Sequence, residues 1–248
     1  MPVVYSYSYN KGLKKKKNED AINVVKNKQG NIISIICDGV SSHKDSAFSS
    51  DYIVNNFSKK WKKTKFDHYD TMKNWVIDNI KLLNLDIIKK SAETNKKMAT
   101  TLLVTVVFEE QILVANVGDS LAFGINNNRI TEMLSKDDSF VGVLLEAGVI
   151  TEEEAKVHPK RHALTQAIGI SENINIHIRE EELKFDYILS CSDGLTTMLT
   201  EEEITDILMN DDLSVAVNNL ISEANNKGGI DNISISVFKV LRGDNDDK

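Results

Sequence analysis

Acidic residues placed at the ends of strand-like apolar stretches are the feature that most limits what this 248-residue chain can fold into. They occur in four short motifs, Asn18-Glu19-Asp20, Asp38-Gly39, Ser192-Asp193-Gly194 and Asp231-Asn232. A buried strand end is a costly place for a bare carboxylate, because the charge loses its water unless a partner replaces it. Several such ends meeting at one point would make an all-oxygen site for hard divalent cations.

Two of these acids are followed at once by glycine, in the pairs Asp38-Gly39 and Asp193-Gly194. Glycine lets the backbone approach an ion closely, so its carbonyl oxygen can act as a ligand beside the carboxylate. Taken alone, each Asp-Gly pair is more typical of an ordinary turn than of a cation site. The set favours a cation site, because three of the four acidic motifs flank strands that look central.

The apolar pattern predicts several strands, at residues 3–9, 21–26, 31–37, 100–108, 112–117, 121–125, 174–180, 187–191 and 233–240. Two long helices are expected at residues 46–63 and 70–92, the second with an apolar stripe, formed by Met72, Val76, Ile80, Leu83 and Ile87. Capping boxes at Thr151 and Thr200 predict two helix starts, and a further helix is expected at 213–224. Strands grouped in blocks favour mainly antiparallel sheets with helices outside.

Composition narrows the class of protein. The formal net charge of −7 argues against general nucleic-acid binding, which needs a basic surface. The run Lys14–Lys17 is a local exception and is either a solvated loop or an anion-binding segment. Two cysteines are too few for a disulfide framework, which indicates a reducing compartment.

The sequence also bears on the number of domains and on the location of the protein in the cell. We expect one domain over residues 1–242, because no linker-like stretch divides it, and a disordered acidic tail over 243–248. The sequence shows no signal peptide and no apolar run of transmembrane length, so we expect a cytoplasmic protein without a membrane partner.

Further motifs lie between the acids in a fixed order, namely Ala99-Thr100-Thr101, Val117-Gly118-Asp119-Ser120, Lys136-Asp137-Asp138-Ser139, Leu164-Thr165-Gln166-Ala167-Ile168-Gly169 and Gly229-Ile230-Asp231-Asn232. From about Gly12 to Val240 the ordered set resembles the metal-dependent protein phosphatases of the PPM (PP2C) family, especially the bacterial Ser/Thr phosphatases. No single motif is decisive, but the whole set in this order is highly specific.

The resemblance implies an α+β fold, a four-layer α/β/β/α sandwich of two mainly antiparallel sheets flanked by helices. It also implies two Mn²⁺ or Mg²⁺ ions and, as in many bacterial members, a third. Asp38 would bridge the two ions, the Gly39 carbonyl would bind one of them, and Asp193 and Asp231 would bind the other. Glu19 and Asp20 would complete the site, either directly or through metal-bound waters. Asp119 would bind the third ion together with Asp193.

The implied activity is hydrolysis of phosphoserine and phosphothreonine in phosphoproteins, including substrates of a Ser/Thr kinase, by a monomeric enzyme. Two cations would offset the phosphate charge and activate a water, which attacks phosphorus without a phosphoenzyme. A cysteine-based phosphatase needs an arginine six residues after its cysteine, where His43 and Thr197 stand instead. A phosphoaspartate route needs a second aspartate two residues on, where Val40 and Leu195 stand.

The chain departs from the family pattern at the residues that would meet the substrate. Lys15 stands where an arginine usually grips the phosphate, and a lysine cannot form the bidentate fork. His43 is either a proton donor to the leaving group or a surface histidine, and Gln166 replaces a common arginine. The segment Ser139 to His162 resembles the family's flap, which would border the cleft. Two alternatives to a general phosphatase stay open, namely a catalytically silent binding module and a phosphatase dedicated to one phosphorylated regulator.

Overall fold

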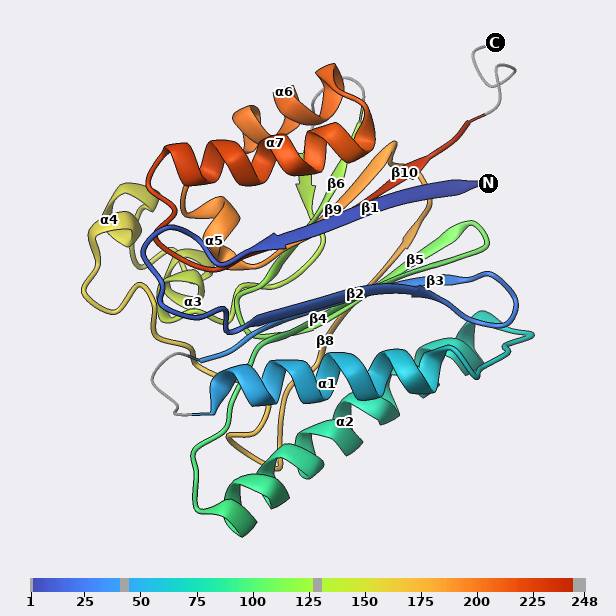
Figure 1. Cartoon of the computed structure of the whole chain (residues 1–248), viewed down its shortest axis with the longest axis horizontal. Helices are drawn as coiled ribbons and strands as arrows, with labels where there is room; N and C mark the ends of the chain where they lie inside the picture. The colour runs from blue at the N-terminus through green and yellow to red at the C-terminus, as the bar shows by residue number, and fades with distance from the viewer. Residues whose placement is uncertain (1, 41–44, 127–130, 243–248) are drawn as a thin grey trace.

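The structure, a computed structural model, describes residues 2–40, 45–126 and 131–242. Two sheets lie face to face, with helices on both outer faces of the pair (Figure 1). Every pairing between neighbouring strands in the two sheets is antiparallel. The predicted α+β fold with four layers, α/β/β/α, is therefore confirmed.

Each sheet has five strands, and the order of strands mixes early and late parts of the chain. The first sheet runs in the order β1 (Val3–Asn10), β10 (Ile233–Val240), β9 (Tyr187–Cys191), β6 (Leu121–Ile125) and β7 (Thr131–Met133). The second runs in the order β2 (Asp20–Lys26), β3 (Ile32–Asp38), β4 (Leu102–Phe108), β5 (Gln111–Val117) and β8 (His177–Glu182).

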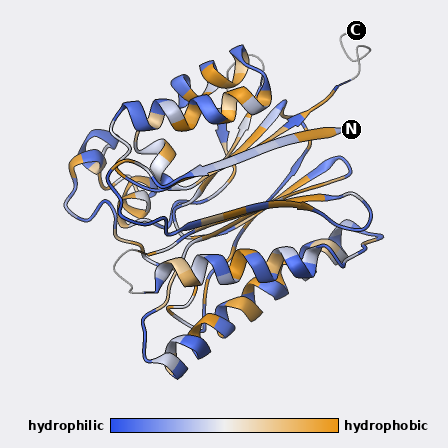
Figure 2. Cartoon of the chain, viewed as in Figure 1, coloured by the Kyte–Doolittle hydropathy of each residue, from blue (hydrophilic) through white to orange (hydrophobic). Residues whose placement is uncertain are grey.

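Amphipathic helices close both outer faces. The second sheet packs against α1 (Ser46–Trp61) and α2 (Tyr69–Thr94), and the first packs against α6 (Glu201–Asn210) and α7 (Leu213–Asn226). Figure 2 shows these helices in alternating hydrophilic and hydrophobic colours, as expected for helices with one buried face. Shorter helices follow the strands at one end of the sandwich, namely α3 (Phe140–Glu146), α4 (Glu152–Val157) and α5 (Asp193–Thr196). Within the described residues, no helix is long and apolar enough to cross a membrane.

Most predicted elements are present, and their bounds show what the pattern could resolve. The strands predicted at 121–125, 187–191 and 233–240 are found with those bounds, and both capping boxes form. The stripe on α2 is fully buried. The strand predicted at 174–180 was misplaced, because Ile174 and Ile176 pack on the core before the strand begins at His177. Neither β7 nor α5 was predicted, because each is too short to show a periodic apolar pattern. The tail predicted at 243–248 lies outside the described residues.

Buried hydroxyl pairs join the two sheets across their apolar interface. Ser34 Oγ on β3 lies 2.6 Å from Ser236 Oγ on β10. Thr105 Oγ1 on β4 lies 2.8 Å from Ser190 Oγ on β9. All four residues are buried, so each hydroxyl depends on its partner in the opposite sheet. The pairs therefore fix the position of one sheet over the other, which in turn sets where the strand ends meet.

We predict that Ser190→Ala lowers the free energy of unfolding by about 1–3 kcal/mol, because it leaves the buried Thr105 hydroxyl without its partner. Adding Thr105→Val removes the unsatisfied hydroxyl and should recover much of that loss. Urea denaturation of the wild type, the two single variants and the double variant measures the coupling. Strictly additive losses would show that the hydrogen bond does not join the sheets.

Candidate active site

One pair of neighbouring strands brings the first acids together. In the antiparallel register of β2 and β3, Asp20 stands directly opposite Asp38. The Gly39 amide donates to the Glu19 carbonyl at 3.1 Å, which places the predicted glycine beside the same strand ends. The Asp38 amide donates to Thr101 Oγ1 at 2.9 Å, and Thr100 Oγ1 donates to the Asp38 carbonyl at 2.8 Å. The backbone on both sides of Asp38 is therefore held in place.

The other sheet brings its acids to the same end of the sandwich. Asp193 opens α5 directly after β9, and Asp231 lies two residues before β10. Ser192 Oγ donates to Asp20 Oδ2 at 2.7 Å and accepts from the Ser234 amide at 2.9 Å. Ser192 thus connects the acid of one sheet to the strand ends of the other.

Electrostatic interactions show that the acids share one buried environment. Burial raises the pKa of Asp38 well above its usual value, and the charges of Asp20, Asp193, Asp119 and Asp231 raise it further. Burial likewise raises the pKa of Asp20 to about 7, against the hydrogen bond from Ser192. These carboxylates repel one another and have lost much of their hydration, so the cluster is a strong attractor for cations.

Two further acids feel the same cluster. Burial and the charge of Asp231 raise the pKa of Asp193, whereas a hydrogen bond shared with Asp38 lowers it. His162, at the end of the predicted flap, also lowers the pKa of Asp193. Burial raises the pKa of Asp119 well above its usual value, and the charge of Asp193 adds to the effect. Asp119 is therefore near the cluster, on the side of Asp193.

The donor chemistry of the cluster fits hard divalent cations. Asp20 Oδ1 and Asp193 Oδ1 are buried and have no hydrogen-bond partner. Uncompensated carboxylate oxygens of this kind are the ligands that Mg²⁺ and Mn²⁺ prefer. Over the described ranges, no group of three or more His, Cys, Asp or Glu side chains is arranged so that it could hold a metal ion as it stands. Asp231 is instead paired with Lys15, whose Nζ lies 2.6 Å from Asp231 Oδ1.

Lysines from the segment between β1 and β2 face these acids. Burial alone would lower the pKa of Lys15, but the ion pair with Asp231 and the charges of Asp38 and Glu19 raise it overall. Lys17 Nζ lies 2.8 Å from Glu19 Oε1, which also accepts a hydrogen bond from Ser46 Oγ. Of the predicted site residues, only His43 lies outside the described residues.

Comparisons with known proteins identify the family of this chain. The family model described as protein phosphatase 2C matches residues 13–224. The chain belongs to the protein phosphatase 2C family. It is 32% identical over 236 residues to protein phosphatase PhpP of Streptococcus pneumoniae, covering 94% of this chain and 96% of that protein. It is also 32% identical over 223 residues to the serine/threonine phosphatase stp of Listeria monocytogenes, covering 88% of each.

Solved structures support the same assignment. The crystal structure of serine/threonine phosphatase Stp1 from Staphylococcus aureus superposes with a TM-score of 0.93 at 28% identity, over 98% of this chain and 96% of that one. The chain is therefore an enzyme of the PP2C phosphatase type, as the sequence motifs predicted.

In this PP2C domain, Asn232 joins residues 11–17, the lysine segment, to the acids. The sequence did not reveal this role. Its side-chain amide donates to the carbonyls of Lys11 at 2.8 Å and Lys17 at 3.1 Å, and its Oδ1 accepts from the Glu19 amide at 2.8 Å. Gly12 is needed here, because its φ is +75° and a Cβ would lie 2.1 Å from the Asp231 carbonyl oxygen. The only sign of these Asn232 contacts in the sequence is that a polar residue follows Asp231.

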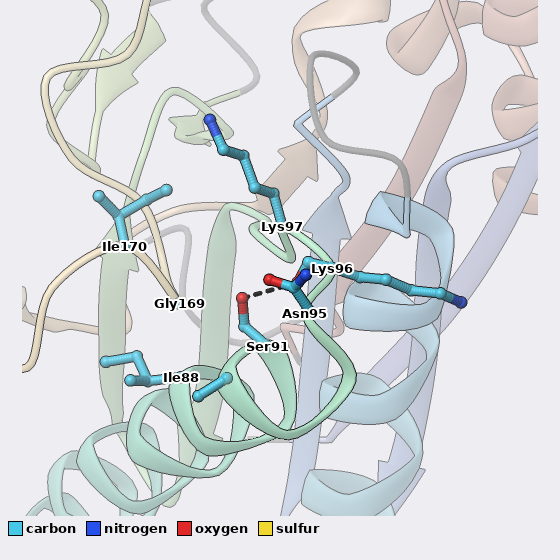
Figure 3. Close-up of a pocket in the computed structure, with 8 residues that line it drawn as sticks. Ile88, Ser91, Asn95, Lys96, Lys97, Gly169 and Ile170 are labelled. Carbon is cyan, nitrogen blue, oxygen red and sulfur yellow. Dashed lines mark hydrogen bonds between the residues drawn. The ribbon is translucent and has the colours of Figure 1, made fainter.

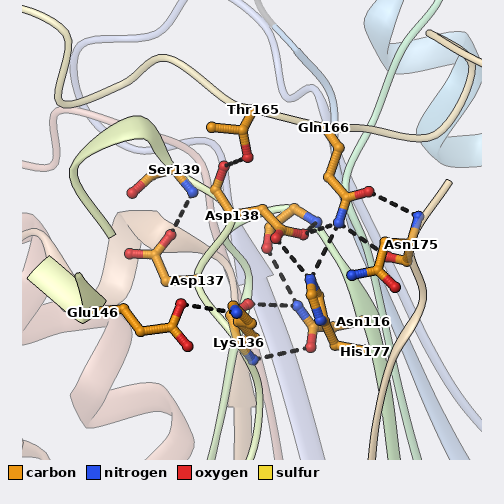
Figure 4. Close-up of polar contacts among 11 residues, drawn as sticks. Asn116, Lys136, Asp137, Asp138, Ser139, Glu146, Thr165, Gln166, Asn175 and His177 are labelled. Atoms are coloured by element: carbon orange, nitrogen blue, oxygen red, sulfur yellow. Dashed lines mark hydrogen bonds and ion pairs between the residues drawn. The ribbon is translucent and has the colours of Figure 1, made fainter. Parts of the chain in front are cut away.

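A second polar cluster is centred on Asp138 and includes Gln166 and His177 (Figure 4). Asp138 is buried, and its carboxylate accepts from the Gly118 amide at 2.9 Å and from Gln166 Nε2 at 2.7 Å. His177 Nε2 lies 2.8 Å from the other Asp138 oxygen. Gln166, where the family commonly has arginine, thus joins β8 and the flap to the Gly118-Asp119 turn. Sequence analysis gave neither Asp138 nor His177 a role.

A pocket of about 460 Å³ lies outside the acid cluster, beside the C-terminal end of α2 (Figure 3). Ile88, Lys97 and Ile170 are among the residues that line it, and none of its lining residues carries a carboxylate. Two isolated β-bridges connect this region to the site, because Thr100 pairs both with Ile168, the neighbour of Gly169, and with Gly39. Unlike the acids at the strand ends, this pocket therefore offers no carboxylate ligand for a cation.

Replacing His177 with alanine should lower the free energy of unfolding by about 1–3 kcal/mol, because the buried Asp138 carboxylate loses a partner. His177→Gln keeps a donor and is expected to retain more of the stability. Thermal and urea unfolding of both variants provide the measurement. The control is Glu182→Ala, at the exposed end of the same strand, and equal losses in all three variants would contradict the assigned contact.

Proposed function

We propose that this chain is a metal-dependent protein phosphatase that hydrolyses phosphoserine and phosphothreonine without a phosphoenzyme. The observation that supports it most is the pair of buried, unpartnered carboxylate oxygens on Asp20 and Asp193, from the two sheets, within one acidic cluster. Two of the relatives named above, stp of Listeria monocytogenes and Stp1 of Staphylococcus aureus, are called serine/threonine phosphatases, which supports the same class of substrate.

Two divalent cations, Mn²⁺ or Mg²⁺, would be held by Asp38, the Gly39 carbonyl, Asp193 and Asp231, with Glu19 and Asp20 as outer support. Asp119 would hold a third ion together with Asp193. When bound, such ions offset the charge of a phosphate monoester and make water a competent nucleophile at neutral pH.

The protein's own groups would orient these acids and bind the substrate. Ser192 keeps Asp20 oriented, and Ser46 and Lys17 do the same for Glu19. Lys15 is held at the acid cluster by Asp231, so its ammonium is placed to bind the phosphate dianion as a point charge. His43 is proposed as the proton donor to the departing serine or threonine oxygen.

The wider setting follows from the same proposal. The substrates would be phosphoproteins, among them products of a Ser/Thr kinase, and nucleic acid would not be a partner, given the net charge of −7. We propose a single domain over residues 1–242 that acts as a monomer in the cytoplasm.

Asp193→Asn is expected to reduce Mn²⁺-dependent hydrolysis of a phosphothreonine peptide by at least about a hundredfold, because it removes a proposed cation ligand. In the wild type, Mn²⁺ should also raise Tm by offsetting the repulsion among buried carboxylates, and the variant should lose most of this shift. The matched control is Asp186→Asn, an aspartate that pairs with Arg242 away from the cluster. A wild type without turnover at saturating Mn²⁺ would favour the catalytically silent alternative.

Lys15→Ala is predicted to lower kcat/KM on a phosphopeptide by roughly tenfold to a hundredfold, the cost of losing one charge-assisted contact to phosphate. Lys15→Arg should match or exceed the wild type, because a guanidinium offers a bidentate fork. Steady-state kinetics of the three proteins under saturating Mn²⁺ test this. An alanine variant with unchanged kcat/KM would remove Lys15 from the site.

A further inference from the structure

The lysine segment carries more positive charge than the proposed phosphate contact needs. Lysines fill five of the seven positions from 11 to 17, in a chain whose net charge is −7. Lys15 and Lys17 pair with Asp231 and Glu19 at the acid cluster. By contrast, Lys14 and Lys16 are exposed and form no ion pair with any residue that the structure describes. Their charges therefore face solvent at the edge of the candidate active site.

The segment is held in a defined conformation. The amides of Leu13 and Lys14 both donate to the Gly229 carbonyl, at 2.8 Å and 3.0 Å. The Asn232 side chain binds the carbonyls of Lys11 and Lys17, and so secures both ends of the segment. Figure 1 shows this stretch, between β1 and β2, at the same end of the sandwich as α5. A fixed backbone holds the exposed ammonium groups near the site, so less order has to be gained when a ligand binds.

We propose that residues 11–17 form a docking surface for acidic residues that flank the phosphorylated residue of a protein substrate. This rests on the proposed function, since it specifies which phosphoproteins the same site favours. Lys14 and Lys16 are the chain neighbours of Lys15, and an extended peptide advances roughly 3.3–3.6 Å per residue. The acidic residues they reach are therefore those within two or three positions of the phosphoresidue.

Charge complementarity favours an acidic peptide over other anions. The surrounding protein is acidic, which disfavours the long polyanionic track of a nucleic acid. A short acidic peptide meets only the local positive patch, because charges beyond roughly 8 Å are screened at physiological salt. Exposed charges at the rim of an interface act mainly on the rate of association, and their influence decreases as the salt concentration rises. We therefore expect the flanking residues of the substrate to change KM more than kcat.

The test compares three phosphothreonine peptides that differ only in their flanking residues, which are acidic, neutral or basic. Three proteins are assayed at saturating Mn²⁺, namely the wild type, Lys14→Glu/Lys16→Glu and the control Lys62→Glu/Lys63→Glu. The control changes the net charge equally, at exposed lysines after α1, at the opposite end of the sandwich (Figure 1). Each kcat/KM is normalised to the same protein's turnover of p-nitrophenyl phosphate, which has no flanks.

The wild type and the control should favour the acidic peptide over the basic one by roughly tenfold, mainly through KM, with the preference shrinking at high salt. In Lys14→Glu/Lys16→Glu the preference should vanish or invert. Equal kcat/KM for the three peptides with the wild type would overturn the docking surface, as would a preference that survives the double reversal. Failure of the proposed function would look different, since the wild type would then not hydrolyse p-nitrophenyl phosphate either.

Discussion

The mutual repulsion of buried and half-buried carboxylates is the constraint on which the arrangement of this molecule depends. Asp20 and Asp38 end neighbouring strands of one sheet, while Asp193 and Asp231 flank strands of the other. Such acids approach only because something else holds the two sheets together. The apolar layer between the sheets and the helices outside them provide that attraction, which grows with the apolar area that is buried. Burial of apolar area therefore offsets the repulsion between the charges at the strand ends and keeps them in place.

Specific polar contacts convert this general attraction into a defined geometry. Hydroxyl pairs such as Ser34 with Ser236 set the position of one sheet over the other. Closer to the acids, Ser192 joins Asp20 to the strands of the opposite sheet, and Asn232 joins the lysine segment to Glu19. Each of these contacts is buried, so a lost partner leaves a group without water to replace it. The geometry of the acids thus depends on neutral residues between them.

The sequence predicted the parts of this structure that follow from periodicity or from short motifs. The stripe on α2 and the strands at 187–191 and 233–240 could be read from apolar spacing alone. The acids were found because several carboxylates stand at the ends of strand-like stretches, where a bare charge is costly, and the family resemblance then assigned their roles. Contacts between distant segments carry no such signal. Asp138 contacts Gln166 and His177 only because tertiary packing brings these residues together. Nothing in the sequence around the three residues indicates that they are partners.

Charge balance explains why the departures from the family pattern lie where they do. Gln166, in place of an arginine, removes a positive charge beside the buried Asp138, and His177 supplies a second nitrogen to the same carboxylate. At the acid cluster, Lys15 and Lys17 provide two ammonium groups where the resemblance leads one to expect a single guanidinium. An ammonium lacks the directional fork of arginine and acts over distance as a point charge. If Lys15 binds the phosphate and residues 11–17 form the docking surface, as we propose, the chain attracts anions at this edge through several lysines and not through one bidentate contact. Its interaction with substrate would then depend on the charge around the phosphate.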